Sequence, residues 1–230
     1  MESKQARLVE SKLIAPDVRH FVFDVPTLEH LPYSAGQFVS LTRDVEGKKI
    51  TRAYSTACPS GGNRFELCLN RVSDGIFSPF LFDLKPGETV EMKGPLGYFT
   101  WRDPVSDSIL VATGTGIAPF RGMAVEYLRR GGTQEITLIF GVRLEESLLY
   151  RDEFEQLERD YANFHFWPTL TRPPESWTGR TGRVQQYTLE VLGERRDMDV
   201  YICGMKAMVD DLRGQLKALG MDRKRTIFEK

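Results

Sequence analysis

The chain has 230 residues, 41% of them hydrophobic and 27% charged, which is ordinary for a globular protein of one or two domains. Its 31 basic and 32 acidic side chains leave a formal charge of −1, so no overall positive charge indicates nucleic-acid binding. No apolar run approaches the roughly 20 residues that span a bilayer, and the first residues lack the apolar core of a signal peptide. Three cysteines in no metal-ligating spacing predict reduced thiols, no metal site and a cytoplasmic protein; they are Cys58, Cys68 and Cys203.

The first hundred residues read as short strands separated by turns. Their β-branched and aromatic residues are bounded by Pro, Gly or Asp, and repeated strands at this spacing predict a small antiparallel barrel. One segment, 75–84, instead has apolar residues at the spacing of a short helix. The expected strands are Ala6–Ile14, Val18–Val25, Gln37–Thr42, Arg52–Ala57, Arg64–Arg71 and Thr89–Met92.

After about residue 102 strands and helices alternate, which predicts a doubly wound parallel sheet with covering helices. The first run, Ile109–Ala112, is apolar throughout, as in a strand buried on both faces. We therefore expect two domains, 1–102 and 103–230. The remaining expected strands are Ile136–Phe140, Asn163–Leu170 and Val200–Cys203, and the expected helices are Pro119–Arg130, Tyr150–Tyr161, Val184–Leu192 and Lys206–Leu219.

A glycine-rich loop follows the first buried strand. Gly114 and Gly116 allow a tight turn and a close approach to a diphosphate, which the N–H groups of a helix N-terminus attract. Pro119 suits the first helical turn, although an ordinary strand-to-helix turn would look the same. Glu135 stands where a Rossmann-type ribose carboxylate would follow. Because Pro119 replaces the third glycine of that fingerprint, we expect Glu135 to be a solvated residue before a strand.

Four short motifs occur in a fixed order along the chain. They are Arg52-Ala53-Tyr54-Ser55-Thr56, Gly75-Ile76-Phe77-Ser78, Gly114–Pro119 and Cys203-Gly204-Met205. Each alone also fits an exposed strand, a turn or simple packing. Together they resemble the ferredoxin–NADP reductase family in its compact bacterial form, over nearly the whole chain. The resemblance implies an FAD-binding barrel followed by a domain that binds a pyridine nucleotide.

The resemblance also implies roles for individual residues around FAD. Arg52 would pair with the flavin diphosphate, Tyr54 would lie against the isoalloxazine ring, and Ser55 would hydrogen-bond near flavin N5. Tyr54 and Ser55 are thus expected in the catalytic set. Further FAD contacts are expected from Leu69, Asn70, Arg71, Gly75, Phe77 and Ser78.

Around the nucleotide, the family's diphosphate loop matches Gly114, Thr115, Gly116 and Pro119, and the turn after the later strand matches Gly204 and Met205. Cys203 would sit beside nicotinamide C4 and help to position it, as the third catalytic residue and without acting as a nucleophile. The plain alternative for Cys203 is a buried small side chain.

The choice of nucleotide depends on what faces the adenosine ribose. A 2′-phosphate favours Arg and hydroxyl partners, whereas a diol favours a carboxylate, and relatives that prefer NADH often carry an acidic residue where Thr171 stands. Thr171 and Arg172, with Arg143, Arg180 and Arg183, therefore predict NADP(H), although each arginine alone also fits a solvated side chain. Arg183 is the weakest evidence for NADP(H), because Gly-Arg-Val also occurs in NADH-using relatives.

The family resemblance implies that a hydride passes to flavin N5 and that electrons leave singly. The chain lacks four cysteines for an iron–sulfur cluster of its own, so we expect a separate carrier, ferredoxin or flavodoxin, and a monomeric reductase. Such carriers are usually acidic. A basic docking rim is expected from Lys48, Lys49, Arg71, Arg223, Lys224 and Arg225, all of which also fit solvated charges.

Two other functions fit the same fold. One is an NADH-dependent reductase component of an oxygenase or cytochrome system. The other is a non-catalytic regulatory subunit that binds flavin and nucleotide, which the lack of a C-terminal cysteine cluster disfavours. At the C-terminus, before Lys230, either Phe228 or Thr226 would face the flavin, or the last strand would simply pack.

Overall fold

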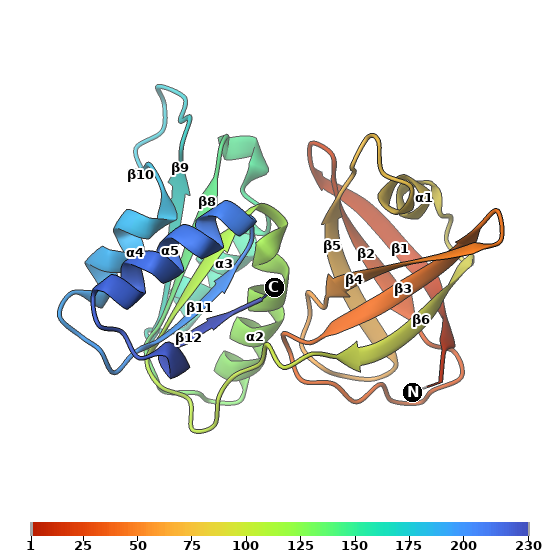
Figure 1. The fold of residues 1–230 in the computed structure, drawn as a ribbon, viewed down its shortest axis with the longest axis horizontal. Coiled ribbons are helices and arrows are strands. Elements are labelled where there is room, and N and C mark those ends of the chain that lie inside the picture. Colours follow the sequence, from red (N-terminus) through yellow and green to blue (C-terminus); the bar gives the residue numbers. More distant parts are fainter. Residues whose placement is uncertain (1, 230) are drawn as a thin grey trace.

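The computed structural model describes residues 2–229, so the Met1 and Lys230 of the predicted domain bounds lie outside the described residues. Two sheets of six strands lie side by side, as Figure 1 shows, with the chain passing from the first to the second after β6.

The first sheet is antiparallel, in the order β4-β3-β6-β1-β2-β5. A bridge between Thr56 and Leu67 joins its two outer strands, β4 and β5, so the sheet closes into a barrel. Phenylalanines fill the interior: the ring centres of Phe23 and Phe65 lie 5.4 Å apart. The elements are β1 (Lys4–Ala15), β2 (Val18–Asp24), β3 (Phe38–Val45), β4 (Lys48–Ser55), β5 (Arg64–Asn70), α1 (Phe77–Asp83) and β6 (Thr89–Leu96).

The second sheet is parallel, in the order β10-β9-β8-β7-β11-β12. The strand order reverses between β7 and β11, the place where such sheets bind ligands. Its elements are β7 (Ser108–Thr113), η1 (Gly114–Ile117), α2 (Ala118–Arg129), β8 (Ile136–Val142), η2 (Glu145–Ser147), α3 (Arg151–Asp160), β9 (Phe164–Leu170), β10 (Arg180–Thr181), α4 (Val184–Leu192), β11 (Asp199–Cys203), α5 (Lys206–Ala218), η3 (Arg223–Arg225) and β12 (Thr226–Phe228).

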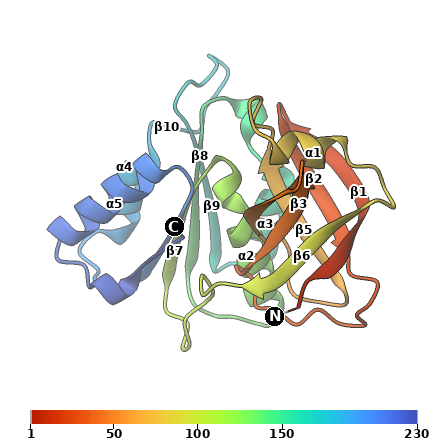
Figure 2. The same ribbon diagram turned by 45° about the vertical axis from the view of Figure 1, so that its right-hand side comes forward.

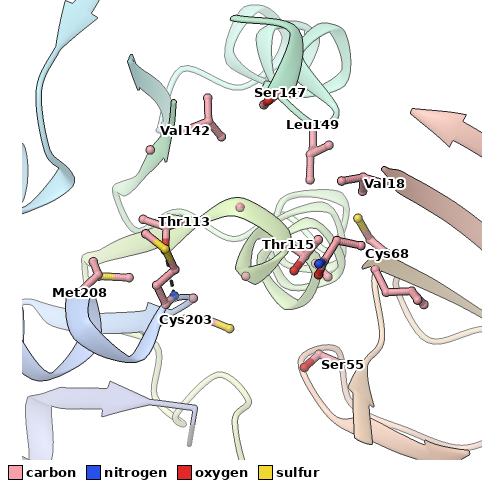
Figure 3. A pocket seen from close by; sticks show the side chains of 18 of the residues that line it. Val18, Ser55, Cys68, Thr113, Thr115, Val142, Ser147, Leu149, Cys203 and Met208 are labelled. Carbon is pink, nitrogen blue, oxygen red and sulfur yellow. Dashed lines mark hydrogen bonds between the residues drawn. The ribbon is translucent and has the colours of Figure 1, made fainter. Parts of the chain in front are cut away.

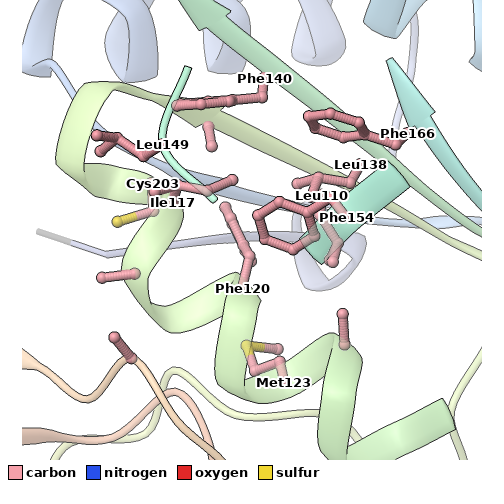
Figure 4. Close-up of a cluster of buried hydrophobic side chains, with 14 of the residues drawn as sticks. Leu110, Ile117, Phe120, Met123, Leu138, Phe140, Leu149, Phe154, Phe166 and Cys203 are labelled. Atoms are coloured by element: carbon pink, nitrogen blue, oxygen red, sulfur yellow. The ribbon is translucent and has the colours of Figure 1, made fainter. Parts of the chain in front are cut away.

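Helices cover both faces of this sheet. Figure 2 shows α2 and α3 between the sheet and the barrel, with α4 and α5 on the opposite face. Phe120 of α2 is fully buried against the sheet residues Leu110 and Leu138 (Figure 4). Burying a side chain of this size stabilises the fold by about 1.5–3 kcal/mol. The apolar contact therefore fixes α2, and the loop that precedes it, against the sheet.

The predicted fold class is confirmed, with corrections at element ends. β4 begins at Lys48 rather than Arg52, because its first residues pair with the end of β3, Val45 opposite Lys48. α1 begins at Phe77 rather than Gly75, since a turn closed by the N–H of Gly75 and the carbonyl of Val72 precedes it. Within residues 2–229, no helix combines the length and hydrophobicity needed to cross a bilayer.

Candidate active site between the two domains

A cavity of about 1400 Å³ lies where the barrel meets the carboxyl ends of the parallel strands. Figure 3 shows Ser55 on the barrel side and Cys203 and Thr113 on the other. The predicted site residues that line it are Arg52, Tyr54, Ser55, Leu69, Asn70, Gly75, Phe77, Ser78, Gly114, Thr115, Gly116, Pro119, Arg143, Thr171, Arg172, Arg183, Cys203, Gly204 and Met205.

Two predicted residues are not among those that line the cavity. The guanidinium of Arg180 lies 3.7 Å from the ring centre of Trp167, and its backbone pairs in β10. The guanidinium of Arg71 lies 5.9 Å from the Phe82 ring centre, while its N–H bonds the carbonyl of Asp17. Stacking on aromatic rings, which sequence spacing does not reveal, draws both side chains away from the cavity.

The barrel wall of the cavity is built from the end of β4 and the start of α1. Tyr54 packs beside Phe77, with ring centres 6.2 Å apart, and burial raises the pKa of Tyr54 to about 12. Its phenol is therefore neutral at physiological pH. Ser78 accepts a hydrogen bond from the N–H of Val72 at 2.9 Å, which holds the turn before α1 in place.

The opposite wall is the loop between β7 and α2, packed on the turn after β11. A Cβ on Gly116 would stand 2.5 Å from the carbonyl oxygen of Cys203. Gly204 has a φ of +142°, and a Cβ there would stand 2.2 Å from Thr113 Oγ1. That same oxygen accepts a 3.0 Å hydrogen bond from the N–H of Met205. Only glycine permits this approach, which places the loop beside Cys203.

Glu229 joins the two domains inside the cavity. The Ser55 hydroxyl donates to its carboxylate, with both oxygens 2.8 Å from Oγ, and the Cys203 thiol donates to Oε2 at 3.2 Å. Burial, and then the nearby Glu229 carboxylate, raise the pKa of Cys203 well above its ordinary value, so the thiol stays neutral. One carboxylate thus holds a hydroxyl from the barrel and a thiol from the parallel sheet.

Sequence reasoning missed Glu229, and of the three alternatives it left open for the C-terminus the structure shows the last, simple packing of the final strand. Phe228 packs with the α4 and α5 side of the sheet, 3.6 Å below the guanidinium of Arg213, so the last strand simply packs there. Neither Phe228 nor Thr226 is among the residues that line the cavity, whereas Glu229 is. Because β12 runs parallel to β11, the residue after Phe228 is carried to the carboxyl edge of the sheet. No motif marks Glu229 in the sequence.

The far end of the cavity combines hydroxyl, cationic and acidic groups. Thr171, Arg172 and Arg183 line it. Two residues that sequence reasoning missed also line it: the amide of Gln185 donates to Asp211 Oδ2 at 2.7 Å. Glu135, by contrast, is exposed beside His165, as expected, and is not among the lining residues.

Comparison with known proteins identifies the family of this chain. Models of an oxidoreductase FAD-binding domain and an oxidoreductase NAD-binding domain match residues 5–101 and 110–214. The full chain is 38% identical to ferredoxin–NADP reductase B of Sorangium cellulosum and spans 98% of that protein. The chain belongs to the ferredoxin–NADP reductase family. It combines the FAD-binding and the NAD-binding domain of this family, as its four motifs predicted.

Other family relatives differ in length and in named role. The chain is 30% identical to the toluate 1,2-dioxygenase electron transfer component of Pseudomonas putida over 205 residues, but spans only 60% of it. A cytochrome P450 reductase of Amycolatopsis has the same fold with a TM-score of 0.90 and 30% identity, over 100% of this chain and 69% of that one. A ferredoxin–NADP reductase of Neisseria gonorrhoeae, solved with FAD and NADP, matches in fold with a TM-score of 0.84 and 22% identity, over 100% and 98%.

Proposed function

We propose that this protein transfers electrons between NADPH and a one-electron carrier protein, ferredoxin or flavodoxin, through bound FAD. The observation that carries the proposal is the meeting of Ser55 and Cys203 on Glu229. A group from each domain converges on one carboxylate, in a cavity with one half formed by each domain. We assign residues 1–102 to FAD and residues 103–230 to the nucleotide.

The barrel half has the features that FAD requires. Arg52 is exposed and its Nη1 bonds the neighbouring carbonyl of Thr51, which leaves the rest of its fork available for a diphosphate. The Tyr54 and Phe77 rings offer an apolar surface for an isoalloxazine ring. Leu69, Asn70, Gly75 and Ser78 line the remainder.

The chain's own residues would bind and orient the reactants. Bound FAD would accept an electron pair from the nucleotide and release electrons singly to the carrier. Ser55 presents its hydroxyl to the flavin half, and Glu229 holds that hydroxyl proton and can exchange it. The neutral Cys203 thiol offers a compact surface that positions the nicotinamide beside the flavin, and it has no nucleophilic role.

The preference for NADPH rests on Thr171, Arg172 and Arg183 at the far end of the cavity. Arg forks and a hydroxyl suit the 2′-phosphate that distinguishes NADPH. The Asp211 carboxylate at the same end favours the second candidate, an NADH-dependent reductase component of an oxygenase system, because a carboxylate suits a ribose diol. Values of kcat/KM for both nucleotides decide between the two.

A carrier would dock near the cavity mouth. Several residues of the expected basic rim are less suited to bind it, because they lie far from the cavity or already form ion pairs. Lys48 and Lys49 begin β4, about 20 Å from Ser55 at its other end, and Lys49 pairs with Glu91. Arg225 pairs with Asp199. We therefore propose that the rim consists chiefly of Arg223 and Lys224, in the turn before β12, on a monomeric cytoplasmic enzyme.

The absorption spectrum of purified protein tests the core of the proposal, followed by anaerobic titration with NADPH. We expect a flavin spectrum that NADPH bleaches, and then electron transfer to ferredoxin or flavodoxin that slows as salt concentration rises. Protein that takes up no FAD on reconstitution would refute the proposal. Carrier reduction that is insensitive to salt would refute the basic rim alone.

A further inference from the structure

Helix α2 touches the barrel along its side while its first turn faces the cavity. A Cβ on Gly122 would stand 2.5 Å from the carbonyl oxygen of Cys58, so helix and barrel backbones are in direct contact. One turn later, Glu126 accepts hydrogen bonds from the N–H and hydroxyl of Ser60 at 3.1 and 2.8 Å. The helix that carries the nucleotide loop is therefore anchored to the barrel.

Arg121 is the buried centre of this contact, with 18% of its side chain exposed. Its Nη1 donates to the carbonyl of Ala57 at 2.6 Å and to Glu66 Oε2, both in the barrel half. Its Nε donates to Glu153 on α3 at 2.7 Å. One guanidinium fork thus ties two helices of the parallel-sheet domain to the barrel, with charge-assisted bonds of fixed geometry.

Tyr150 extends the same network to a second cavity segment. Its ring centre lies 4.7 Å from the Arg121 guanidinium, and its hydroxyl lies 2.8 Å from His20 Nδ1 on β2. It has a φ of +56°, a conformation rare for residues other than glycine, so its surroundings must hold it there. Ser147 and Leu149, just before it, line the cavity.

The protonation state of His20 suits its hydrogen bond with Tyr150. His20 Nε2 lies 3.4 Å from Glu66 Oε2, and burial lowers the pKa of His20, so the imidazole is neutral. The neutral ring has one unprotonated nitrogen, so Nδ1 can accept the hydrogen bond from the Tyr150 hydroxyl. Tyr150 is hydrogen-bonded to His20, Arg121 is hydrogen-bonded to Glu66, and His20 lies beside Glu66, so the four residues form one polar cluster.

We propose that Arg121, Glu66, His20 and Tyr150 form an interdomain latch that positions the nucleotide loop and segment 147–149 against the flavin half of the cavity. The proposal rests on the proposed function. None of the four lines the cavity, so they act as positioning residues. Both anchored segments belong to the nucleotide side, and a shift of about 1 Å between reacting groups can slow a reaction about 100-fold.

Two latch variants of the FAD-loaded enzyme test the proposal, Tyr150→Phe and Arg121→Lys. The control is Arg129→Met, which removes an exposed cationic side chain at the end of the same helix. Stopped-flow reduction of flavin over a range of NADPH concentrations gives a limiting rate and a nucleotide Kd. We expect the limiting rate of both latch variants to fall roughly 10- to 100-fold with Kd nearly unchanged, and the control to match wild type. An unchanged limiting rate, or a change in Kd alone, would overturn the latch.

Hydrogen exchange supplies a readout that needs no reaction. In the latch variants we expect faster exchange in residues 57–66 and in residues 147–154 together, with β3 and β7 unchanged. Failure of wild-type flavin to react with either nucleotide would refute the proposed function but leave this measurement valid. Exchange equal to wild type in both segments would overturn the latch by itself.

Discussion

The hydroxyl of Ser55 and the carboxylate of Glu229 lie 2.8 Å apart although 174 positions separate them in the chain. Ser55 ends a barrel strand, and Glu229 follows the last strand of the parallel sheet. The bond therefore exists only when both domains are folded and docked, and it orients the Ser55 hydroxyl in the cavity.

Glu229→Gln tests the role proposed for this carboxylate. An amide keeps the shape but binds the Ser55 and Cys203 protons less strongly and cannot exchange a proton, so we expect flavin reduction to slow by about 100-fold. FAD content should not change. The control is Glu175→Gln, an exposed side chain away from the cavity lining. A wild-type reduction rate in Glu229→Gln would show that the carboxylate has no part in the reaction.

Arg172→Ala tests the assignment of the nucleotide. Loss of a charge-assisted hydrogen bond to a 2′-phosphate costs about 1.5–3 kcal/mol, which corresponds to a roughly 10- to 150-fold weaker Kd for NADPH. The Kd for NADH should not change, because NADH lacks that phosphate. Arg159→Ala, an exposed residue on α3, is the control. Equal weakening for both nucleotides would mean that Arg172 binds a group that the two share.

His20 makes folding stability depend on pH. Burial is the largest effect on its pKa, which lies below the ordinary value of 6.5, while Glu66, Glu153 and Glu10 oppose that shift and Arg121 adds to it. The unfolded chain therefore binds the proton more readily than the folded protein. Stability should be complete above about pH 6.5 and fall as the pH decreases from there through the folded pKa.

Urea denaturation at pH 7.5 and 5.5 measures this dependence. We expect His20→Gln to lose less stability than wild type between the two values, because the variant has no imidazole to protonate. The exposed His165 pairs with Glu135, so His165→Gln is the matched control. The same loss in wild type and His20→Gln would assign the pH dependence to other groups.

Two glycine substitutions should change different properties: one should weaken nucleotide binding and the other should stabilise the fold. In Gly116→Ala the new Cβ meets the Cys203 and Gly204 backbone, which cannot yield, so the nucleotide loop must shift. We expect nucleotide binding to weaken strongly while FAD stays bound. Gly214 is exposed within α5 with open space around its Cα, so Gly214→Ala should stabilise the fold by about 0.5–1 kcal/mol. Isothermal titration and thermal unfolding measure the two effects, and normal nucleotide binding by Gly116→Ala would contradict the first.

Most of the fold could be predicted from local patterns. Alternating and continuous apolar runs report which strand faces are buried, and the glycine loop reports a backbone that must turn tightly. These signals depend on neighbours in the chain, so the elements and the loop Gly114–Pro119 follow from sequence. Element ends were less accurate at β4 and α1, where hairpin pairing and a preceding turn decide the boundary.

The sequence by itself determined the two-domain organisation, the order of the four motifs and hence the family. Only the tertiary structure decided that Glu229 enters the cavity, that Arg180 stacks on Trp167, and that Arg121 ties α2 to the barrel. The physical reason is the separation along the chain over which each kind of interaction acts. Propensity and periodicity act over a few residues, whereas these contacts join side chains that come together only when separate elements pack.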